Sequence, residues 1–212
     1  MIISGYKYGD IQCSHTYAYL LPIVLEELAA ALPKDKPRRI FDLGCGNGST
    51  ANILSGKGYT VAGVDPSVEG IEQARKNFPT LQLEVGSTEQ DLASRYGQFS
   101  AVLSLEVVEH VFAPREYAKR VFDLLEPGGV AVISTPYHGY WKNLAMALTG
   151  RLDAHFTALW DYGHIKFWSI RTLTTLLQEA GFEEVRFHRV GRFPVLAKSM
   201  IAVARKPKWA GN

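Results

Sequence analysis

The chain has 212 residues, 47% of them hydrophobic, which is enough for one α/β domain with a buried core. Its 23 Lys and Arg against 21 Asp and Glu leave a net charge of +2, so composition alone gives no reason to expect a polyanionic partner. The 2 cysteines are too few for a disulfide framework, no stretch approaches the roughly 18 apolar residues of a membrane span, and no signal-peptide core opens the chain. We therefore expect a soluble cytoplasmic protein.

Hydrophobic periodicity and the positions of Gly and Pro predict an alternation of helices and strands. The predicted elements are a helix at 16–32, strands at 39–43, 59–65, 81–85, 99–104 and 130–135, and intervening helices at 49–56, 67–78, 88–95 and 114–125. Strands separated by helices form parallel βαβ units, hence a doubly wound, Rossmann-like α/β sheet. After a helix at 169–180, the strand-like runs 184–190 and 196–204 are joined by a short connection and form an antiparallel hairpin.

The stretch FDLGCGNGST, residues 41–50, places three glycines between the first predicted strand and the next helix. Such a turn brings bare backbone and helix N-terminal N–H groups to a ligand at the carboxyl edge of the sheet. Asp65 ends the second strand, where its carboxylate can accept hydrogen bonds from both hydroxyls of a ribose. The pattern indicates an adenosine-type cofactor, whereas a tight turn without a ligand explains one glycine but not three.

The spacing Asp42-x-Gly44-x-Gly46-x-Gly48 differs from the G-x-G-x-x-G of dinucleotide folds, which argues against the alternative of an NAD-dependent oxidoreductase. Over about residues 38–205 the chain resembles the class I S-adenosylmethionine-dependent methyltransferases. That resemblance implies a seven-stranded sheet with one antiparallel strand near the C-terminus. The cofactor-binding residues that it implies are Asp42, Gly44, Cys45, Gly46, Asn47, Gly48, Asp65, Pro66, Ser87, Thr88, Ser104 and Leu105.

Within that set, Ser87 departs from the pattern, because related proteins often have an acidic residue against the adenine amine. A hydroxyl or carbonyl of this turn can accept from the amine instead. The alternative is that Ser87 and Thr88 form a plain helix N-cap.

The run SLEVVEHV, residues 104–111, follows the fourth strand. If it makes a helical turn, Glu106 shares a face with Glu109 and His110, and these three side chains form a catalytic cluster. The alternative is that Glu106 stabilises a helix N-terminus and His110 caps a carbonyl. A phenol has a pKa of about 10, so methylating its oxygen needs a base such as His110 or a bound cation.

The Glu-x-x-Glu-His run resembles that of the ubiquinone-biosynthesis O-methyltransferases, as do EPGG at 126–129 and EAGF at 179–182. This resemblance implies O-methylation of a phenolic, catechol-like or lipid-linked small molecule, and a divalent cation such as Mg²⁺ held by Glu106, Glu109 and His110. An asparagine expected after the fifth strand is replaced by Tyr137. The signature of DNA amino-methylating enzymes is missing, so we expect no DNA partner. A catalytically silent cofactor-binding protein remains a further alternative.

Residues 137–168 are too long for an ordinary connection and contain eleven Tyr, Trp, Phe or His among thirty-two residues. We expect an insertion that covers the substrate, with His138, Trp141 and His164 binding it. An amphipathic stretch at 140–152 fits a peripheral membrane contact or a pocket roof, and packing on the sheet edge is the alternative. The predicted single domain, 1–212, comprises an N-terminal helical lid (1–37), a cofactor-binding core (38–136), this insertion, and a last helix with the hairpin (169–205).

Overall fold

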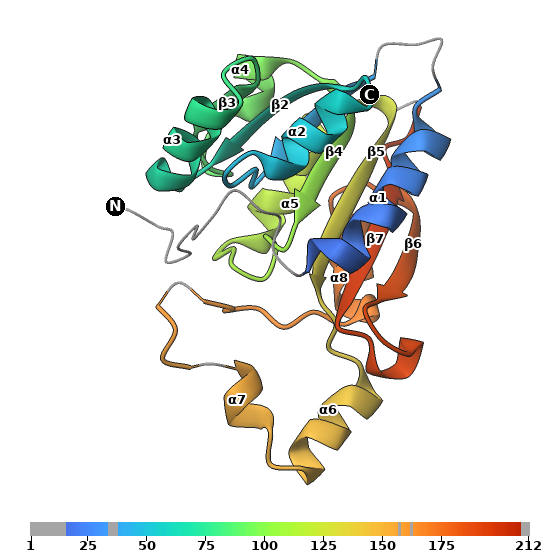
Figure 1. Cartoon of the computed structure of the whole chain (residues 1–212). Helices are drawn as coiled ribbons and strands as arrows, with labels where there is room; N and C mark the ends of the chain where they lie inside the picture. The colour runs from blue at the N-terminus through green and yellow to red at the C-terminus, as the bar shows by residue number, and fades with distance from the viewer. Residues whose placement is uncertain (1–15, 34–37, 157, 162, 209–212) are drawn as a thin grey trace.

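The computed structural model describes residues 16–33, 38–156, 158–161 and 163–208 (Figure 1). The strands are β1 Arg39–Leu43, β2 Thr60–Asp65, β3 Gln82–Val85, β4 Phe99–Leu105, β5 Leu125–Pro136, β6 Glu183–Val190 and β7 Ser199–Arg205. The helices are α1 Tyr17–Ala31, α2 Ser49–Gly56, α3 Val68–Asn77, α4 Leu92–Tyr96, α5 Pro114–Asp123, α6 Tyr140–Leu148, α7 Leu152–Phe156 and α8 Ile170–Glu179, with a 3₁₀ turn, η1, at Pro194–Leu196.

The seven strands form one sheet in the order β3-β2-β1-β4-β5-β7-β6. β1 to β5 pair in parallel, while β7 is antiparallel to both β5 and β6. The predicted doubly wound α/β sheet with a C-terminal antiparallel hairpin is therefore confirmed. The hairpin places β7, and not β6, next to β5.

Four predicted boundaries are wrong by two residues or more. The strand predicted to begin at Val130 begins at Leu125. The helix predicted to run to Leu125 ends at Asp123, because Leu125 already pairs with Phe99 of β4. The helix predicted from Thr88 begins at Leu92, where the Asp91 side chain accepts a hydrogen bond from the Ser94 amide. The last strand begins at Ser199, since the chain first makes the turn η1. Each error lies where a local cap or turn defines the end.

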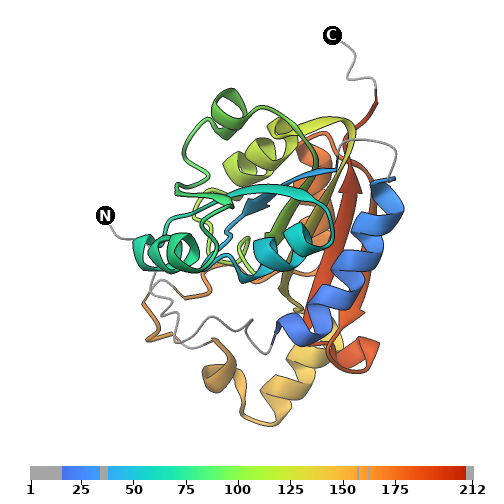
Figure 2. The same cartoon turned by 45° about the horizontal axis from the view of Figure 1, so that its top comes forward.

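Helices cover both faces of the sheet, as the two views show (Figures 1 and 2). α1, α2 and α3 pack on one face through side chains such as Leu20, Leu54 and Ile71. α4, α5 and α8 pack on the other through residues such as Tyr117 and Leu173. Strands buried on both faces explain the near-continuous apolar runs in the sequence.

α1 is fixed to the far edge of the sheet by an ion cluster as well as by apolar packing. The Glu27 carboxylate is buried and accepts hydrogen bonds from Arg186 and from Nε2 of His188, both on β6. These contacts lower the pKa of Glu27, with the Arg186 hydrogen bond as the largest cause. The lid predicted for 1–37 depends largely on residues 1–15, which lie outside the described residues, so it stays a prediction.

The carboxyl ends of β1, β2, β4 and β5 meet at one edge, which we call the carboxyl edge. From β1 the chain adds β2 and β3 in one direction across the sheet, and then β4 and β5 in the other. Ligands of open α/β sheets bind at the switch point between β1 and β4, where the direction reverses. α6 and α7 extend beyond this edge (Figure 1). Tyr137 and Trp168 pair in an isolated parallel bridge, so the segment 137–168 leaves and rejoins the domain at one point.

Candidate active site

The glycine loop after β1 is held mainly by main-chain hydrogen bonds. The amides of Gly44 and Cys45 both donate to the Val64 carbonyl of β2, at 2.8 and 3.1 Å. Asp65 accepts from the Gly46 amide at 2.9 Å and from the Ser67 amide at 2.8 Å. Each carboxylate oxygen retains a further lone pair, so Asp65 can position the loop and still accept from a ribose.

Two glycines of the loop are required by the protein's own packing. A Cβ on Gly44 would lie 2.3 Å from Cγ2 of Val107, and one on Gly48 would lie 2.7 Å from Cδ1 of Leu83. Both residues also have positive φ, 87° and 80°, which disfavours any other side chain. The bare backbone at these two positions is thus explained by close approach of protein atoms and by φ, in addition to any ligand.

The acidic groups of the loop are buried. Asp42 is 3% exposed, and burial, followed by the charge of Asp65, raises its pKa to about 7. Burial also raises the pKa of Asp65, against the effect of its two main-chain donors. Such a pair of carboxylates favours a cationic ligand, because a positive charge offsets both burial and repulsion. Burial raises the pKa of the Cys45 thiol well above its usual range, so this cysteine is not a nucleophile.

The remaining predicted cofactor residues lie in the glycine loop, directly after Asp65 and at the end of β4. The Asn47 side chain accepts from the amide and hydroxyl of Ser49, the first residue of α2. Pro66, half-buried, directly follows Asp65. Leu105 is buried at the end of β4, and Ser104 before it lies close to the Tyr117 hydroxyl of α5, away from the loop.

The turn after β3 approaches Asp65, since the Gly86 amide donates to the Asp65 carbonyl at 3.1 Å. Ser87 accepts from the Glu89 amide at 3.3 Å through its hydroxyl, and Thr88 is half-buried. The helix N-cap expected as an alternative at Ser87 and Thr88 is wrong, since the helix begins at Leu92.

Glu106 turns back onto β5 as soon as β4 ends. Its φ is 56°, and its amide donates to both the carbonyl and the hydroxyl of Ser134. The Ser134 hydroxyl in turn donates to the Glu106 carboxylate at 2.8 Å, while burial raises the pKa of Glu106 to about 7. The left-handed conformation, which costs a non-glycine residue roughly 1–3 kcal/mol, breaks the helical turn on which the predicted shared face depended.

Glu109 is buried, with 1% of its surface exposed. Within the described parts of the chain, neither of its carboxylate oxygens has a hydrogen-bond partner. Burial, and then the nearby charge of Glu106, raise the pKa of Glu109 well above its usual range. The Thr135 hydroxyl is close enough to lower this pKa in part, and a carboxyl held neutral by burial keeps oxygens that a ligand can use.

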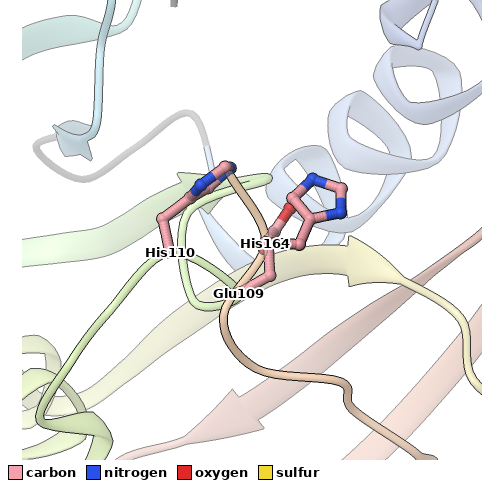
Figure 3. A group of neighbouring side chains, drawn as sticks. All are labelled: Glu109, His110 and His164. Carbon is pink, nitrogen blue, oxygen red and sulfur yellow. The ribbon is translucent and has the colours of Figure 1, made fainter. Parts of the chain in front are cut away.

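His110 and His164 lie beside Glu109. His110 contacts Gly163, the residue before His164, across a sequence separation of 53 residues. Nδ1 of His110 is 3.0 Å from the Gly163 carbonyl, and the rings of His110 and His164 are 4.9 Å apart. One ligand atom from each of Glu109, His110 and His164 lies within 4.8 Å of the others (Figure 3). Among the described residues Glu106 is not a member of this group, so the predicted metal ligand set fits in two of its three positions.

The insertion contributes a second aromatic cluster. The His138 ring lies 5.1 Å from both His155 and Phe167, and Phe156 packs against the same rings. Burial lowers the pKa of both His138 and His164 to about 4, so both rings are neutral at physiological pH. Of the three predicted substrate residues, His138 belongs to this cluster, His164 packs against His110 and Trp160, and Trp141 is 63% exposed on α6. Its substrate contact stays a prediction.

Sequence reasoning missed two parts of this site, Lys142 and Ser134, whereas His155 belongs to the aromatic-rich insertion that it indicates. Lys142 is buried at 9% exposure and donates to the carbonyls of Tyr137 and Lys198, and burial lowers its pKa to about 8. His155 joins the aromatic cluster, and Ser134 holds Glu106. Only Lys142 had a local signal, as a single charge in the otherwise uncharged helix YWKNLAMAL.

Known proteins that are similar to this chain identify its family. A family model described as a methyltransferase domain matches residues 14–186. A ubiquinone biosynthesis O-methyltransferase of Dinoroseobacter shibae is 34% identical over 179 residues, which are 78% of this chain and 71% of that protein. One of Caulobacter sp. is 36% identical over 126 residues, 58% of this chain and 48% of that protein. The matched region therefore covers between about half and 71% of these relatives.

Solved structures share the fold. A protein of Thermotoga maritima described as an S-adenosylmethionine-dependent methyltransferase aligns with a TM-score of 0.61 at 20% identity, covering 86% of each chain. Phosphoethanolamine N-methyltransferase 2 of Haemonchus contortus, in complex with S-adenosyl-L-methionine, aligns with a TM-score of 0.64 at 15% identity, covering 88% of this chain and 52% of that one.

A doubly wound sheet with a glycine loop and a carboxylate at its switch point defines a nucleotide-cofactor-binding domain. The chain belongs to the methyltransferase domain family and is an S-adenosylmethionine-dependent methyltransferase.

Proposed function

We propose that the protein transfers the methyl group of S-adenosylmethionine to a hydroxyl of a small phenolic, catechol-like acceptor. The names of its relatives support the oxygen acceptor. Asp42 and the main chain of 44–48 bind the methionine portion, and Asp65 accepts from the ribose. The two buried carboxylates suit a cofactor that carries a sulfonium and an ammonium group.

The observation that carries this proposal is the position of His110 at the end of β4. Its Nδ1 faces the Gly163 carbonyl at 3.0 Å, and a carbonyl only accepts, so Nδ1 carries the proton. Nε2 then holds the lone pair and is the basic nitrogen of the ring. His110 takes the phenolic proton as the oxygen attacks the methyl group in line with the departing sulfur.

The divalent cation implied by the resemblance would be held by Glu109 and His110, whose buried carboxyl and oriented imidazole suit it. The Nε2 lone pair would then go to the ion, and His110 would act through the ion in place of taking the proton itself. When bound, such a cation lowers the pKa of the acceptor hydroxyl. Glu106 holds the turn that presents these residues by its hydrogen bonds to Ser134.

The test compares His110→Ala with His110→Asn, assayed against a panel of catechols by mass spectrometry for the gain of one methylene. Both should lower kcat by about 10²–10⁴, since both remove the base. The Asn amide can still donate to the Gly163 carbonyl, so only the Ala variant should loosen the 163–168 segment in hydrogen exchange. Cofactor binding is checked by titration with S-adenosylhomocysteine, with NAD as the negative control. Unchanged transfer by either variant would exclude His110 as the base.

We also propose that α6 and η1 dock on an anionic lipid surface from which a lipid-linked acceptor is presented. The two elements are in contact, and their exposed side chains are aromatic or aliphatic. The fractions exposed are 74% for Tyr140, 63% for Trp141, 78% for Leu148 and 84% for Phe193. Arg192 lies beside Phe193 at an open pocket of about 600 Å³, and Arg151 and Lys198 are exposed nearby. Within the described residues no helix is long and apolar enough to cross a bilayer.

Vesicle co-sedimentation tests this contact. Wild type should bind vesicles that contain phosphatidylglycerol, and Trp141→Ser and Phe193→Ser should each weaken binding several-fold by removing buried apolar area. Phe112→Ser is the matched control, because Phe112 is an 87% exposed aromatic outside α6 and η1. Equal losses for all three variants, or equal binding to uncharged vesicles, would contradict the proposed surface.

A further inference from the structure

The segment 163–168 is clasped onto the turn 108–110 by hydrogen bonds on both sides of His164. The amides of Ile165 and Lys166 each donate to the Glu109 carbonyl at 2.9 Å. Trp168 Nε1 donates to the Val108 carbonyl at 3.1 Å, and the Gly163 carbonyl faces Nδ1 of His110 at 3.0 Å. His164 therefore cannot move independently of Glu109 and His110. The insertion delivers this imidazole to a fixed place.

The three side chains have the features of a ligand set. The Glu109 carboxyl is almost completely buried and has no hydrogen-bond partner among the described residues, so both of its oxygens are available to a cation, whose charge would favour the ionised form. The proton on Nδ1 of His110 points at a carbonyl, which is the usual way in which the other ring nitrogen is oriented towards a metal. His164 adds a second imidazole within the same 4.8 Å cluster (Figure 3).

Glu106 does not take the third position. Its carboxylate accepts from the Ser134 hydroxyl at 2.8 Å, and its main chain is fixed by the same serine. The third ligand thus comes from the substrate-covering insertion instead of from the turn after β4. One carboxylate and two imidazoles form a nitrogen-rich set, whereas Mg²⁺ prefers oxygen ligands and retains several waters.

We propose that Glu109, His110 and His164 form a binding site for a borderline divalent transition-metal ion, of which Zn²⁺ and Co²⁺ are representatives. Ligand atoms around tetrahedral Zn²⁺ lie roughly 3.3–3.6 Å apart at bond lengths of about 2.0–2.2 Å, so the cluster closes by about an ångström on binding. The inference deepens the proposed function, on which its catalytic meaning rests, but the binding site itself does not depend on the acceptor.

The test is a titration of chelator-treated protein with Co²⁺, without cofactor or acceptor, followed by the visible absorption of the bound ion and by metal content after dialysis. Wild type should bind one ion per chain, Zn²⁺ should displace Co²⁺, and an excess of Mg²⁺ should not. His164→Ala and Glu109→Gln should weaken binding by at least about 100-fold, because loss of outer partners alone already costs about 10–100-fold.

Two matched controls accompany these variants. Glu106→Gln removes the negative charge expected from the sequence but keeps a side-chain oxygen that accepts from the Ser134 hydroxyl, and His155→Ala removes another histidine of the insertion, so both should bind Co²⁺ like wild type. Wild-type affinity in His164→Ala, loss of affinity in Glu106→Gln, or competition by Mg²⁺ would each overturn the inference. Metal binding without methyl transfer to any catechol would refute the proposed acceptor only. Methyl transfer without metal binding would refute the metal site only.

Discussion

Around the ends of β1 and β2 the polar contacts are mostly made by main-chain groups, whereas around the ends of β4 and β5 they are mostly made by side chains. The Val64 carbonyl accepts from two amides of the glycine loop, and the Asp65 carboxylate accepts from the amides of Gly46 and Ser67. On the other side, Ser134 holds Glu106, and a cluster of Glu109, His110 and His164 gathers. A geometry set by the main chain tolerates little change, while one set by side chains can be altered residue by residue.

We call the ends of β1 and β2 the cofactor side, and the ends of β4 and β5 with the segment 137–168 the acceptor side, after the methyl acceptor. The two sides also differ in which buried polar atoms have no hydrogen-bond partner among the described residues. Among the described residues, buried polar atoms without a hydrogen-bond partner include those of Glu109, Thr135 and His138 on the acceptor side, and one oxygen of Asp42 on the cofactor side. Substitutions on the two sides should therefore separate, with cofactor affinity affected by one set and acceptor kinetics by the other.

The largest effect should come from Gly44→Ala, which attacks the main-chain side. The new Cβ would lie 2.3 Å from Val107 Cγ2 at a φ of 87°. Overpacking of about 1–3 kcal/mol and backbone strain of about 1 kcal/mol should lower the free energy of unfolding by roughly 2–4 kcal/mol, as measured by urea unfolding. Affinity for S-adenosylhomocysteine should fall with it.

The double variant Gly44→Ala with Val107→Ala is the control for this effect. It removes Cγ2 and should recover the overpacking part of the loss while the backbone strain remains. A double variant no more stable than Gly44→Ala would show that the contact with Val107 is not the cause.

Lys142→Met should affect the acceptor side alone. It removes the donor to the Tyr137 and Lys198 carbonyls; the Lys198 carbonyl keeps the Tyr137 amide as a donor, and the loss at the half-buried Tyr137 carbonyl should cost about 1–3 kcal/mol. Hydrogen exchange of α6 should accelerate and the KM for a catechol should rise, while affinity for S-adenosylhomocysteine stays constant. Lys119→Met, on the exposed face of α5, should change none of these. A loss of cofactor affinity in Lys142→Met would contradict the prediction that substitutions on the acceptor side leave cofactor binding unchanged.

The pKa of Asp42, raised to about 7, predicts a pH dependence of the cofactor side. A carboxyl with a raised pKa stabilises the fold below its unfolded value and loses that contribution as the pH rises through the folded value. The ammonium group of the methionine portion, which S-adenosylhomocysteine keeps, favours the ionised form of Asp42, so affinity for S-adenosylhomocysteine should rise about tenfold from pH 6 to pH 8, as the ionised fraction of one such group does. Calorimetry measures this, and Asp42→Asn should give a flat profile. If the affinity of the wild type is also independent of pH, ionisation of the Asp42 carboxyl does not contribute to binding.

Ser87→Ala should have the smallest effect on stability. Among the described residues the hydroxyl accepts one 3.3 Å hydrogen bond, from the Glu89 amide in an exposed turn, so stability should change by less than about 0.5 kcal/mol. Any larger fall in affinity for S-adenosylhomocysteine would then report a contact with the adenine. Ser94→Ala, at an exposed serine of α4, is the reference for a change of stability alone.

Much of the sheet could be predicted from the sequence because its signals are local. Apolar runs bounded by Gly and Pro locate β1 to β5, and a short connection between two β-rich runs is enough to predict the antiparallel hairpin. The glycine spacing and Asp65 likewise predict the cofactor side, since each residue there acts through the turn in which it lies.

The acceptor side could be predicted only in part, because its contacts are between segments far apart in the chain. Glu106 follows the expected spacing, but its left-handed φ and its contact with Ser134 depend on β5. His164 reaches Glu109 only through the hydrogen bonds of its neighbours. Periodicity does show that α6 is amphipathic, yet it does not show that Lys142 faces inward while Trp141 faces out.

The single bridge between Tyr137 and Trp168 has a consequence for how such an enzyme can diversify. Because everything between these residues starts and finishes at the same spot, loop length can change with only a small entropic penalty, about 0.6 kcal/mol per doubling for a flexible loop. Exchange of that stretch between relatives that keep a histidine at the position of His164 would give chimeras with a different acceptor specificity on the same sheet.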